Sequence, residues 1–319
     1  MRLSFLSYVL TILFLVILAS LVVWVFDSFS DKEENIAAPL PSSLTILTNK
    51  QVSTLDLWTP LIEAIVGSQA PVLSAESALT YDIVQNKTLY AKNPDTRLPM
   101  ASLTKIMTAI VALENKKIDD AYLVHASDLV GENVMGLTAR EVLTLEDLLY
   151  GLILPSGNDA AETLASNYVS GRSGFIRAMN DKAKALGLQN TNFTNPSGLQ
   201  GDGDQYTTVS DLLVMTRYAL SIPLFAKVAA TVEHEIPYTI DHKYFYLFNE
   251  TNLLTSYPGV KGVKDGYTPE AGLCLVTYLD YDGHKIIGVI LGSNNRRAEM
   301  KELLDYSLKS IGVTPPKHD

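Results

Sequence analysis

The sequence predicts an α+β fold, in which an antiparallel sheet is built from both ends of one domain and a helical subdomain packs beside it. Strand patterns open the domain after residue 74, helical patterns fill its middle, and strand patterns return after residue 227. Of the 319 residues 47% are hydrophobic and 19% are charged, so the chain can bury a substantial core.

An uncharged apolar run at residues 5–26 precedes this domain and is long enough to cross a bilayer as a helix. It is longer than the apolar part of a typical cleaved signal peptide, and no small-x-small cleavage site follows it. Arg2 lies before the run and acidic residues lie after it, so the positive-inside tendency places residues 1–4 in the cytoplasm. We therefore expect an uncleaved single-pass anchor with the remainder of the chain outside.

Residues 27–73 have a mixed composition with Pro, Ser and Thr, which predicts a stalk between the anchor and the domain. A short helix is expected within it near residues 55–66. The domain itself is expected at 74–312, followed by a tail at 313–319.

The first half of the domain carries one hairpin signal and then four helical signals. Alternating apolar and polar residues around Gln85-Asn86-Lys87 predict a β-hairpin. Helical patterns then occupy residues 102–114, 145–168 with an interruption at Pro155, 174–186, and 210–220 with Ser210 as the expected N-cap.

The second half is expected to return to strands from Lys227 onward. Segments 274–281 and 285–291 flank Tyr281-Asp282-Gly283-His284, a strong turn signal that predicts a second hairpin. A closing helix is expected at residues 297–308.

The composition excludes several classes of function. The chain has 35 acidic and 25 basic residues and a formal charge of -10, which argues against a nucleic-acid partner because phosphate binding needs clustered Lys and Arg. Cys274 is the single cysteine, so no intramolecular disulfide can form, and the five histidines are too scattered to suggest metal-ligand spacing. We expect neither a metal nor a cofactor.

Ser102 stands at the start of a helical pattern, and Lys105 follows three residues later. One helical turn brings the two side chains to the same face. A neutral lysine can activate a serine nucleophile, and desolvation, nearby positive charge and the helix N-terminus all favour the neutral form. The spacing alone is common, and it usually means an N-cap and a solvated lysine.

A second motif lies where Pro155 and Gly157 break a helical run, which places Ser156 and Asn158 on a loop. A hydroxyl and an amide two residues apart can face one cleft, where Ser156 would relay a proton and Asn158 would hold a substrate amide. A simple turn between two helices is an equally good interpretation of this segment in isolation.

A third motif, Lys264-Asp265-Gly266-Tyr267, precedes a predicted strand. Gly266 would let another backbone approach closely, as an edge strand that binds an extended peptide requires, and Lys264 would add positive charge beside Lys105. Lys-x-Gly alone normally indicates a loop. The three motifs are more informative together than alone, because they occur in the order Ser-x-x-Lys, Ser-x-Asn, Lys-x-Gly and each lies at a predicted structural transition.

With these motifs the chain resembles the serine-type D-alanyl-D-alanine carboxypeptidases among the low-molecular-mass penicillin-binding proteins, a peptidase S11-like family, over about residues 74–308. The resembling segments are L-P-M-A-S-L-T-K-I-M-T-A, P-S-G-N-D-A-A, N-P-S-G-L at 195–199, T-T-V-S-D-L at 207–212 and G-Y-T-P-E-A-G-L-C at 266–274. The resemblance implies a β-lactamase/transpeptidase-like fold, peptidoglycan stem peptides as substrates and β-lactam antibiotics as covalent inhibitors. It also implies a bacterial plasma membrane, with the catalytic domain outside.

The resemblance further implies a role for each motif residue. Ser102 would form the acyl-enzyme with Lys105 as its base, and Ser156 and Asn158 would act in proton transfer and substrate binding. Lys264 would orient the substrate and take part in the proton relay. The same resemblance assigns substrate contacts to Gly266 and Tyr267, and an oxyanion hole to the backbone N–H groups of Ser102 and Tyr267.

Asp265 departs from the family pattern, in which Thr or Ser stands between the Lys and the Gly and helps to receive the carboxylate of the departing D-alanine. An ionised Asp265 would place two carboxylates together, at a cost of about 4 kcal/mol for a separation of about 4 Å and an effective dielectric of about 20. Three solutions are open: Asp265 is protonated, it is paired with Lys264 or another cation, or the substrate lacks a carboxylate at that point.

Together these observations favour a D,D-carboxypeptidase and leave three alternatives open. A D,D-endopeptidase that cleaves cross-links fits a substrate without that carboxylate. A peptidoglycan-binding homologue impaired by Asp265 is another alternative, although the other motif residues are intact. A β-lactamase-like hydrolase is the third, but no deacylating glutamate is identifiable.

The expected tether also differs from that of relatives that carry a carboxyl-terminal β domain and an amphipathic anchor helix.

Overall fold

The computed structural model describes residues 58–62, 70–117, 119–251 and 253–318. All of them lie in one unit of the chain, Val52–Asp319. The predicted anchor and residues 27–57 and 63–69 of the predicted stalk lie outside the described residues. Of the short helix expected near residues 55–66, only 58–62 are described, and they form no regular element. Within the described ranges no single helix is long and apolar enough to cross a membrane. Two consecutive helices, Val209–Leu220 and Pro223–Ala229, reach that length and composition only when they are taken together, and the pair is sharply bent between them.

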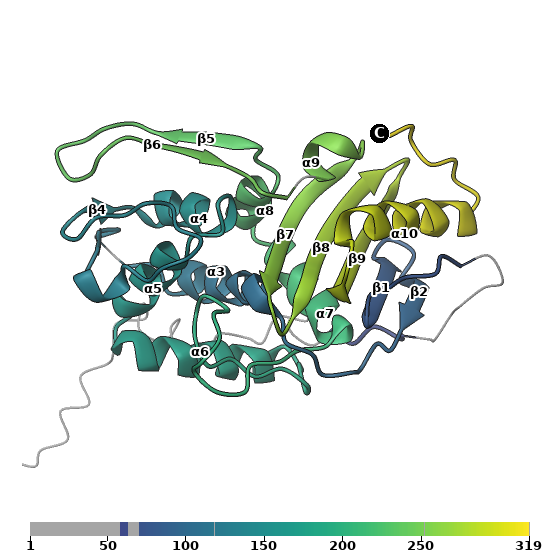
Figure 1. Cartoon of the computed structure of the whole chain (residues 1–319), viewed down its shortest axis with the longest axis horizontal. Helices are drawn as coiled ribbons and strands as arrows, with labels where there is room; N and C mark the ends of the chain where they lie inside the picture. The colour runs from purple at the N-terminus through teal and green to yellow at the C-terminus, as the bar shows by residue number, and fades with distance from the viewer. Residues whose placement is uncertain (1–57, 63–69, 118, 252, 319) are drawn as a thin grey trace, which may run out of the picture. The chain divides into compact units, whose positions relative to one another are not determined.

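A five-stranded antiparallel sheet joins the two ends of the domain in the order β2-β1-β9-β8-β7 (Figure 1). Its strands are β1 Ser77–Asp82, β2 Lys87–Lys92, β7 Val260–Thr268, β8 Gly272–Tyr281 and β9 His284–Ser293. β1 pairs with β9 in a register that runs from Ser77 opposite Leu291 to Asp82 opposite Ile286. The predicted sheet from both ends of the domain is therefore confirmed.

Both predicted hairpins are also present. In the β8–β9 hairpin Tyr281 pairs with His284, and the two residues between them have positive φ, 49° at Asp282 and 80° at Gly283. Positive φ at both central positions is the backbone of a type I′ turn, whose twist matches that of the flanking strands. The turn residues therefore set the register of the two longest strands.

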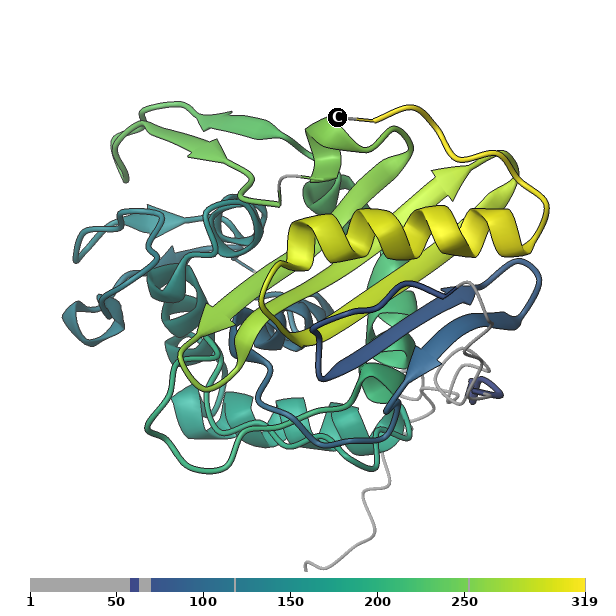
Figure 2. The same ribbon diagram turned by 45° about the vertical axis from the view of Figure 1, so that its right-hand side comes forward.

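Helices cover both faces of the sheet (Figure 2). They are α3 Thr104–Glu114, α4 Leu145–Ile153, α5 Asn158–Ser166, α6 Gly171–Ala185, α7 Val209–Leu220, α8 Pro223–Ala229, α9 Leu253–Ser256 and α10 Arg296–Ser310. The closing helix α10 packs on one face, while α7 packs against β1 and β9 within the other layer. Ile286 and Ile290 of β9 join the core under α10, whereas Ile287 and Val289 join the core of the helical part. This alternation explains why β9 reads as a continuous apolar run.

Two small sheets complete the fold: β3 Tyr122–Leu123 with β4 Val142–Leu143, and β5 Glu233–Ile236 with β6 Phe245–Phe248. The β5–β6 pair forms an arm above α4 in Figure 1. Strand signals were expected from Lys227, but that residue lies in α8, and the first strand begins six residues later. The prediction was wrong at this point because Pro223 at the first helical position starts one more helix.

The expected N-cap of α7 is a second correction. Thr208, not Ser210, caps the helix, because its side chain accepts a hydrogen bond from the backbone N–H of Asp211. Ser210 is already inside the helix, and its hydroxyl contacts the Pro94 carbonyl and the Asp95 carboxylate instead. Both residues are good caps by type, so local sequence could not separate them.

Candidate active site

Ser102 lies in a tight 3₁₀ turn, Ala101–Leu103, that leads directly into α3. Ala101 has a φ of +48°, a left-handed conformation that a non-glycine residue rarely adopts. Strained backbone of this kind persists only where surrounding structure enforces it. Here the turn directs Ser102 into a pocket of about 200 Å³ that also contains Ser156, Asn158, Asp265 and Arg296.

Lys105 lies one turn further along α3 and is fully buried. Its Nζ atom donates to Ser102 Oγ at 3.0 Å, to Asn158 Oδ1 at 2.7 Å and to the carbonyl of Ser197 at 2.8 Å. Burial, followed by the positive charge of Lys264, holds the pKa of Lys105 well below its usual range. A deprotonated amine three ångströms from a serine hydroxyl can accept its proton, which is what a general base must do.

The break between α4 and α5 places the second motif beside this pair. Gly157 is required at the break, because a Cβ atom there would lie 2.7 Å from the carbonyl oxygen of Gly151. Ser156 has a φ of +60° and lines the pocket. Asn158 binds Lys105 through its side-chain oxygen, and its Nδ2 donates to the Gly131 carbonyl at 3.2 Å. The segment is therefore more than a turn between two helices, because it also brings Ser156 to the pocket and Asn158 to Lys105.

Asp159, to which the sequence analysis assigned no role, anchors the loop opposite Asn158. Its carboxylate accepts hydrogen bonds from the backbone N–H groups of Met135, Gly136 and Leu137 at 2.9 to 3.0 Å. The loop in turn accepts a hydrogen bond from the Asn158 N–H at the carbonyl of Asn133. A buried carboxylate that satisfies three successive amides fixes a backbone which otherwise has no regular structure.

The N-P-S-G-L segment builds the other wall around Lys105. Asn195 Oδ1 accepts hydrogen bonds from the N–H groups of Ser197 and Gly198, and its Nδ2 donates to the Leu199 carbonyl at 2.7 Å. This turn aims the Ser197 carbonyl at Lys105. Gly198 has a φ of +90°, and a Cβ atom there would lie only 2.0 Å from the carbonyl oxygen of Ala101. The segment therefore packs directly against the nucleophile turn.

Strand β7 carries the third motif past the nucleophile. A Cβ atom on Gly266 would lie 2.9 Å from the backbone nitrogen of Ser102, so the glycine lets the strand pass close to the turn. Tyr267 is 61% exposed and lines the rim of the pocket. The assignment of the Ser102 and Tyr267 N–H groups to an oxyanion hole stays a prediction.

Asp265 is buried between two cations. Its Oδ1 accepts a hydrogen bond from Lys264 Nζ at 2.8 Å, and its Oδ2 accepts one from Arg296 Nη2 at 2.5 Å. Burial alone would raise the pKa of Asp265, but the charges of Lys264 and Arg296 outweigh it and hold the pKa below its usual value. Of the three solutions open for Asp265, the geometry favours pairing and disfavours protonation.

Arg296 and Glu250 are pocket residues that the sequence analysis missed. Arg296 begins α10 and also donates to the Gly266 carbonyl at 2.6 Å. Glu250 lines the pocket, and Asn133 Nδ2 donates to its carboxylate at 3.2 Å. Desolvation, followed by the negative charge of Asp265, raises the pKa of Glu250. Neither residue belongs to a short motif, so only the tertiary structure brings them to the site.

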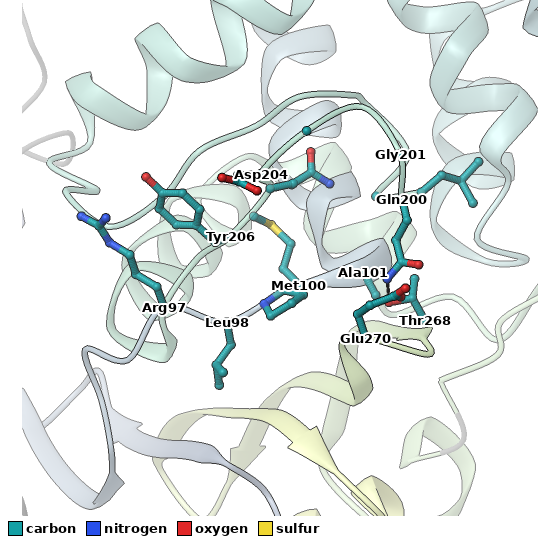
Figure 3. Close-up of a pocket in the computed structure, with 15 residues that line it drawn as sticks. Arg97, Leu98, Met100, Ala101, Gln200, Gly201, Asp204, Tyr206, Thr268 and Glu270 are labelled. Atoms are coloured by element: carbon teal, nitrogen blue, oxygen red, sulfur yellow. Dashed lines mark hydrogen bonds between the residues drawn. The ribbon is translucent and has the colours of Figure 1, made fainter.

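A larger pocket of about 440 Å³ adjoins the first one and shares Gly198, Leu199 and Thr268 with it. In Figure 3, Arg97 and Tyr206 lie at one end of it, while Gln200, Thr268 and Glu270 lie at the other. The Arg97 guanidinium stacks on Tyr206 at 4.9 Å from the ring centre, and Gln200 Nε2 donates to Thr268 Oγ1 at 3.1 Å. The two pockets therefore share one wall, while Ser102 lines only the smaller one.

Comparison with known proteins agrees with the motifs. A family model described as D-alanyl-D-alanine carboxypeptidase matches residues 65–295. A D-alanyl-D-alanine carboxypeptidase of Bacillus subtilis is 35% identical over 251 residues, which are 76% of this chain and 64% of that protein. A D-alanyl-D-alanine endopeptidase of Pseudomonas aeruginosa is 33% identical over 72% of this chain and 78% of its own length. The chain thus matches just under two thirds of the Bacillus relative.

The fold is similar to that of a solved structure. The crystal structure of the Streptomyces K15 DD-transpeptidase has a TM-score of 0.71 and 32% sequence identity, with 75% of this chain and 99% of that chain covered. The transpeptidase-like fold expected from the sequence is therefore confirmed.

Proposed function

Because this chain belongs to the D-alanyl-D-alanine carboxypeptidase family of serine hydrolases, we propose that it cleaves peptidoglycan stem peptides as a D,D-peptidase through an acyl-enzyme on Ser102. One observation carries the proposal. The Lys105 amine is fully buried, has a lowered pKa and lies 3.0 Å from Ser102 Oγ. An N-cap serine followed by a solvated lysine would show neither burial nor this contact.

The reaction begins when Lys105 takes the Ser102 proton and Oγ bonds to the carbonyl carbon of the penultimate D-alanine. The oxyanion that forms is stabilised by the N–H groups of Ser102 and Tyr267. The proton returns through Lys105 and Ser156 to the leaving nitrogen, and the C–N bond breaks to leave an ester on Ser102. Water then hydrolyses this ester and restores the serine.

The binding residues hold the substrate against this machinery. Asn158 is buried beside Lys105, and we assign it to the binding of a substrate amide. Lys264 belongs to β7 and supplies a buried positive charge within the strand with which the extended peptide is expected to pair. β-Lactam antibiotics acylate the same serine in our proposal, because their strained amide presents a carbonyl to the same nucleophile.

Two substrates separate the candidate activities. A purified pentapeptide stem and a cross-linked dimer are incubated with the full-length protein, and the products are identified by mass spectrometry. A carboxypeptidase releases D-alanine from the pentapeptide, whereas an endopeptidase divides the dimer. The contact between Asp265 and Arg296 favours the endopeptidase as the second candidate. Ser102→Ala should abolish both reactions, and turnover that survives this substitution would refute the proposal.

We also propose that residues 5–26 anchor the protein in a bacterial plasma membrane with the catalytic domain outside. The support is the uncharged apolar run and the distribution of charge around it. When the gene is expressed in bacteria, the full chain should sediment with membranes and be digested by protease added to spheroplasts. A chain that begins at residue 27 should lose the membrane association. Full-length protein in the soluble fraction would contradict the anchor.

A further inference from the structure

The pocket beside Ser102 is lined mainly by negative charge. Four charged side chains line it, and three are carboxylates: Glu132, Glu250 and Asp265. The fourth is the guanidinium of Arg296. A pocket with this balance does not attract an anion unless the arginine is free to bind it.

Arg296 is not free. One terminal nitrogen donates to Asp265 Oδ2 and the other donates to the Gly266 carbonyl, so both prongs of the guanidinium fork are engaged. Each terminal nitrogen keeps one further N–H, but the positive charge of Arg296 is already paired with Asp265, so a second carboxylate would share the guanidinium with Asp265 and be repelled by it. The other oxygen of Asp265 is held by Lys264, whose side chain is fully buried, so Asp265 is fixed from two sides.

The proton-transfer groups identify this pocket as the leaving-group side. Ser156, which returns the proton to the leaving nitrogen in the proposed reaction, lines this pocket and not the larger one. Asp265 likewise lines this pocket and not the larger one, whereas Thr268, three residues further along β7, lines both. Whatever substituent the leaving amine carries must therefore approach Asp265 and Arg296.

We propose that Asp265 makes this site selective for leaving amines without a carboxylate beside the scissile nitrogen, such as a lysine side-chain amine in a cross-link or an amidated amino acid. This inference rests on the proposed D,D-peptidase function. Asp265 acts here as a specificity-determining residue. It pairs with Arg296 and repels a carboxylate on the leaving group, whereas a neutral or cationic leaving group is accepted. The bonds made and broken are those of the proposed reaction, and only the substituent on the released amine differs.

Two peptides that differ in one group test the selectivity. Diacetyl-L-lysyl-D-alanyl-D-alanine has a terminal carboxylate, and the same peptide with a C-terminal amide has none. Release of D-alanine or D-alaninamide by the full-length protein in mild detergent gives kcat/KM for each. We expect the native protein to prefer the amide by about tenfold or more, because a substrate carboxylate close to the buried carboxylate of Asp265 is strongly disfavoured.

Substitution of Asp265 should reverse this preference. In Asp265→Thr the arginine is released and the negative charge is removed, so we expect the acid-to-amide ratio of kcat/KM to rise by about a hundredfold. Asp265→Asn keeps the size of the side chain and should move the ratio in the same direction. If Asp265→Thr fails to fold, the comparison is made with Asp265→Asn instead. Asp82→Asn is the matched control, because Asp82 is also buried in the same sheet but pairs with His284 outside both pockets.

The outcomes separate the inference from the function on which it rests. A native protein that prefers the free acid as strongly as Asp265→Thr does would overturn the inference and leave the D,D-peptidase intact. The inference also fails if the native protein cleaves neither peptide while Asp265→Thr cleaves the acid, since Asp265 would then block the site altogether. No cleavage by any folded variant would instead refute the proposed function. A changed ratio in Asp82→Asn would show that loss of a buried carboxylate alone produces the effect.

Discussion

The chemistry of Lys105 depends on where its side chain is held. The helical spacing from Ser102 brings the amine within reach of the hydroxyl, but many exposed Ser-x-x-Lys pairs have that spacing. What distinguishes this lysine is complete burial, with Asn158 Oδ1 and the Ser197 carbonyl as acceptors for its nitrogen and Ser102 Oγ 3.0 Å away as the group whose proton it can take. Burial and the nearby charge of Lys264 lower its pKa, which makes a base of a group that is normally protonated.

The lowered pKa of Lys105 predicts a pH dependence with a definite sign. Activity needs the neutral amine, so kcat/KM should fall as the pH drops through the pKa of Lys105. The negative charge of Asp265 raises this pKa, against the larger effect of burial. Asp265→Asn should therefore shift the acidic limb of the profile to lower pH. The profile is measured with the amide peptide to avoid effects on substrate charge, and a shift to higher pH would contradict the assignment.

Asn158 offers a second test of the same base. In Asn158→Asp a carboxylate replaces the amide oxygen 2.7 Å from Lys105 Nζ, and its charge should keep the lysine protonated. We expect kcat/KM near neutral pH to fall by about a hundredfold, within the range that general-base catalysis contributes. Activity should recover partly at alkaline pH. Asn158→Ala is the control: it also weakens binding but adds no charge, so its loss should not recover in this way.

At the scale of elements, four segments meet at one point: the turn before α3, the break between α4 and α5, the N-P-S-G-L loop and strand β7. Three of the four carry a glycine that permits close approach. Gly157, Gly198 and Gly266 all lie where an added Cβ atom would come within 3 Å of another backbone. The motifs therefore encode the packing of backbones as much as the placement of reactive side chains.

Gly198→Ala tests the packing against the nucleophile turn. The added methyl group would collide with the Ala101 carbonyl, in addition to the strain of a positive φ. We expect the free energy of unfolding to fall by about 2 kcal/mol or more and acylation of Ser102 to slow. Gly201→Ala is the matched control, because Gly201 has a φ of +108° and nothing within 4 Å of an added Cβ. Equal effects of the two substitutions on acylation would show that the contact with Ala101 does not matter.

The sequence was informative where a signal is local and less informative where the structure depends on distant segments. The turn at Asp282 and Gly283 and the break at Gly157 could be predicted because each rests on the backbone preferences of a few residues. The Ser197 carbonyl could not be assigned to Lys105, because any residue type supplies a carbonyl. Arg296 could not be paired with Asp265, because 30 residues and two further strands lie between them.

At the scale of the whole molecule, the sheet connects the first and last parts of the domain. β1 lies between β2 and β9, and α10 returns across the face of this sheet (Figure 2). The core under α10 combines residues from both ends of the chain, among them Ala78, Ile290 and Leu304. Arg296 at the start of α10 is also the residue that holds Asp265. The closing helix therefore stabilises both the sheet and one wall of the pocket.

Leu304→Ala tests this connection. The side chain is fully buried, so its truncation should lower the free energy of unfolding by about 2–5 kcal/mol. Because α10 packs on strands from both ends, we expect circular dichroism and loss of Ser102 acylation to follow one transition in urea. Two separate transitions would show that the helical part holds the site without the sheet. Lys309→Ala, an exposed change in the same helix, serves as the control.

The identity of the nucleophile is tested most directly by a covalent adduct. The native protein, Asp265→Thr and Ser102→Ala are incubated with benzylpenicillin and mapped by peptide mass spectrometry. We expect penicilloyl ester on the peptide that contains Ser102, formed faster in Asp265→Thr because the antibiotic carries a carboxylate, and no adduct in Ser102→Ala. Absence of an adduct from both the native protein and Asp265→Thr, or an adduct that persists in Ser102→Ala, would contradict the assignment of Ser102 as the nucleophile.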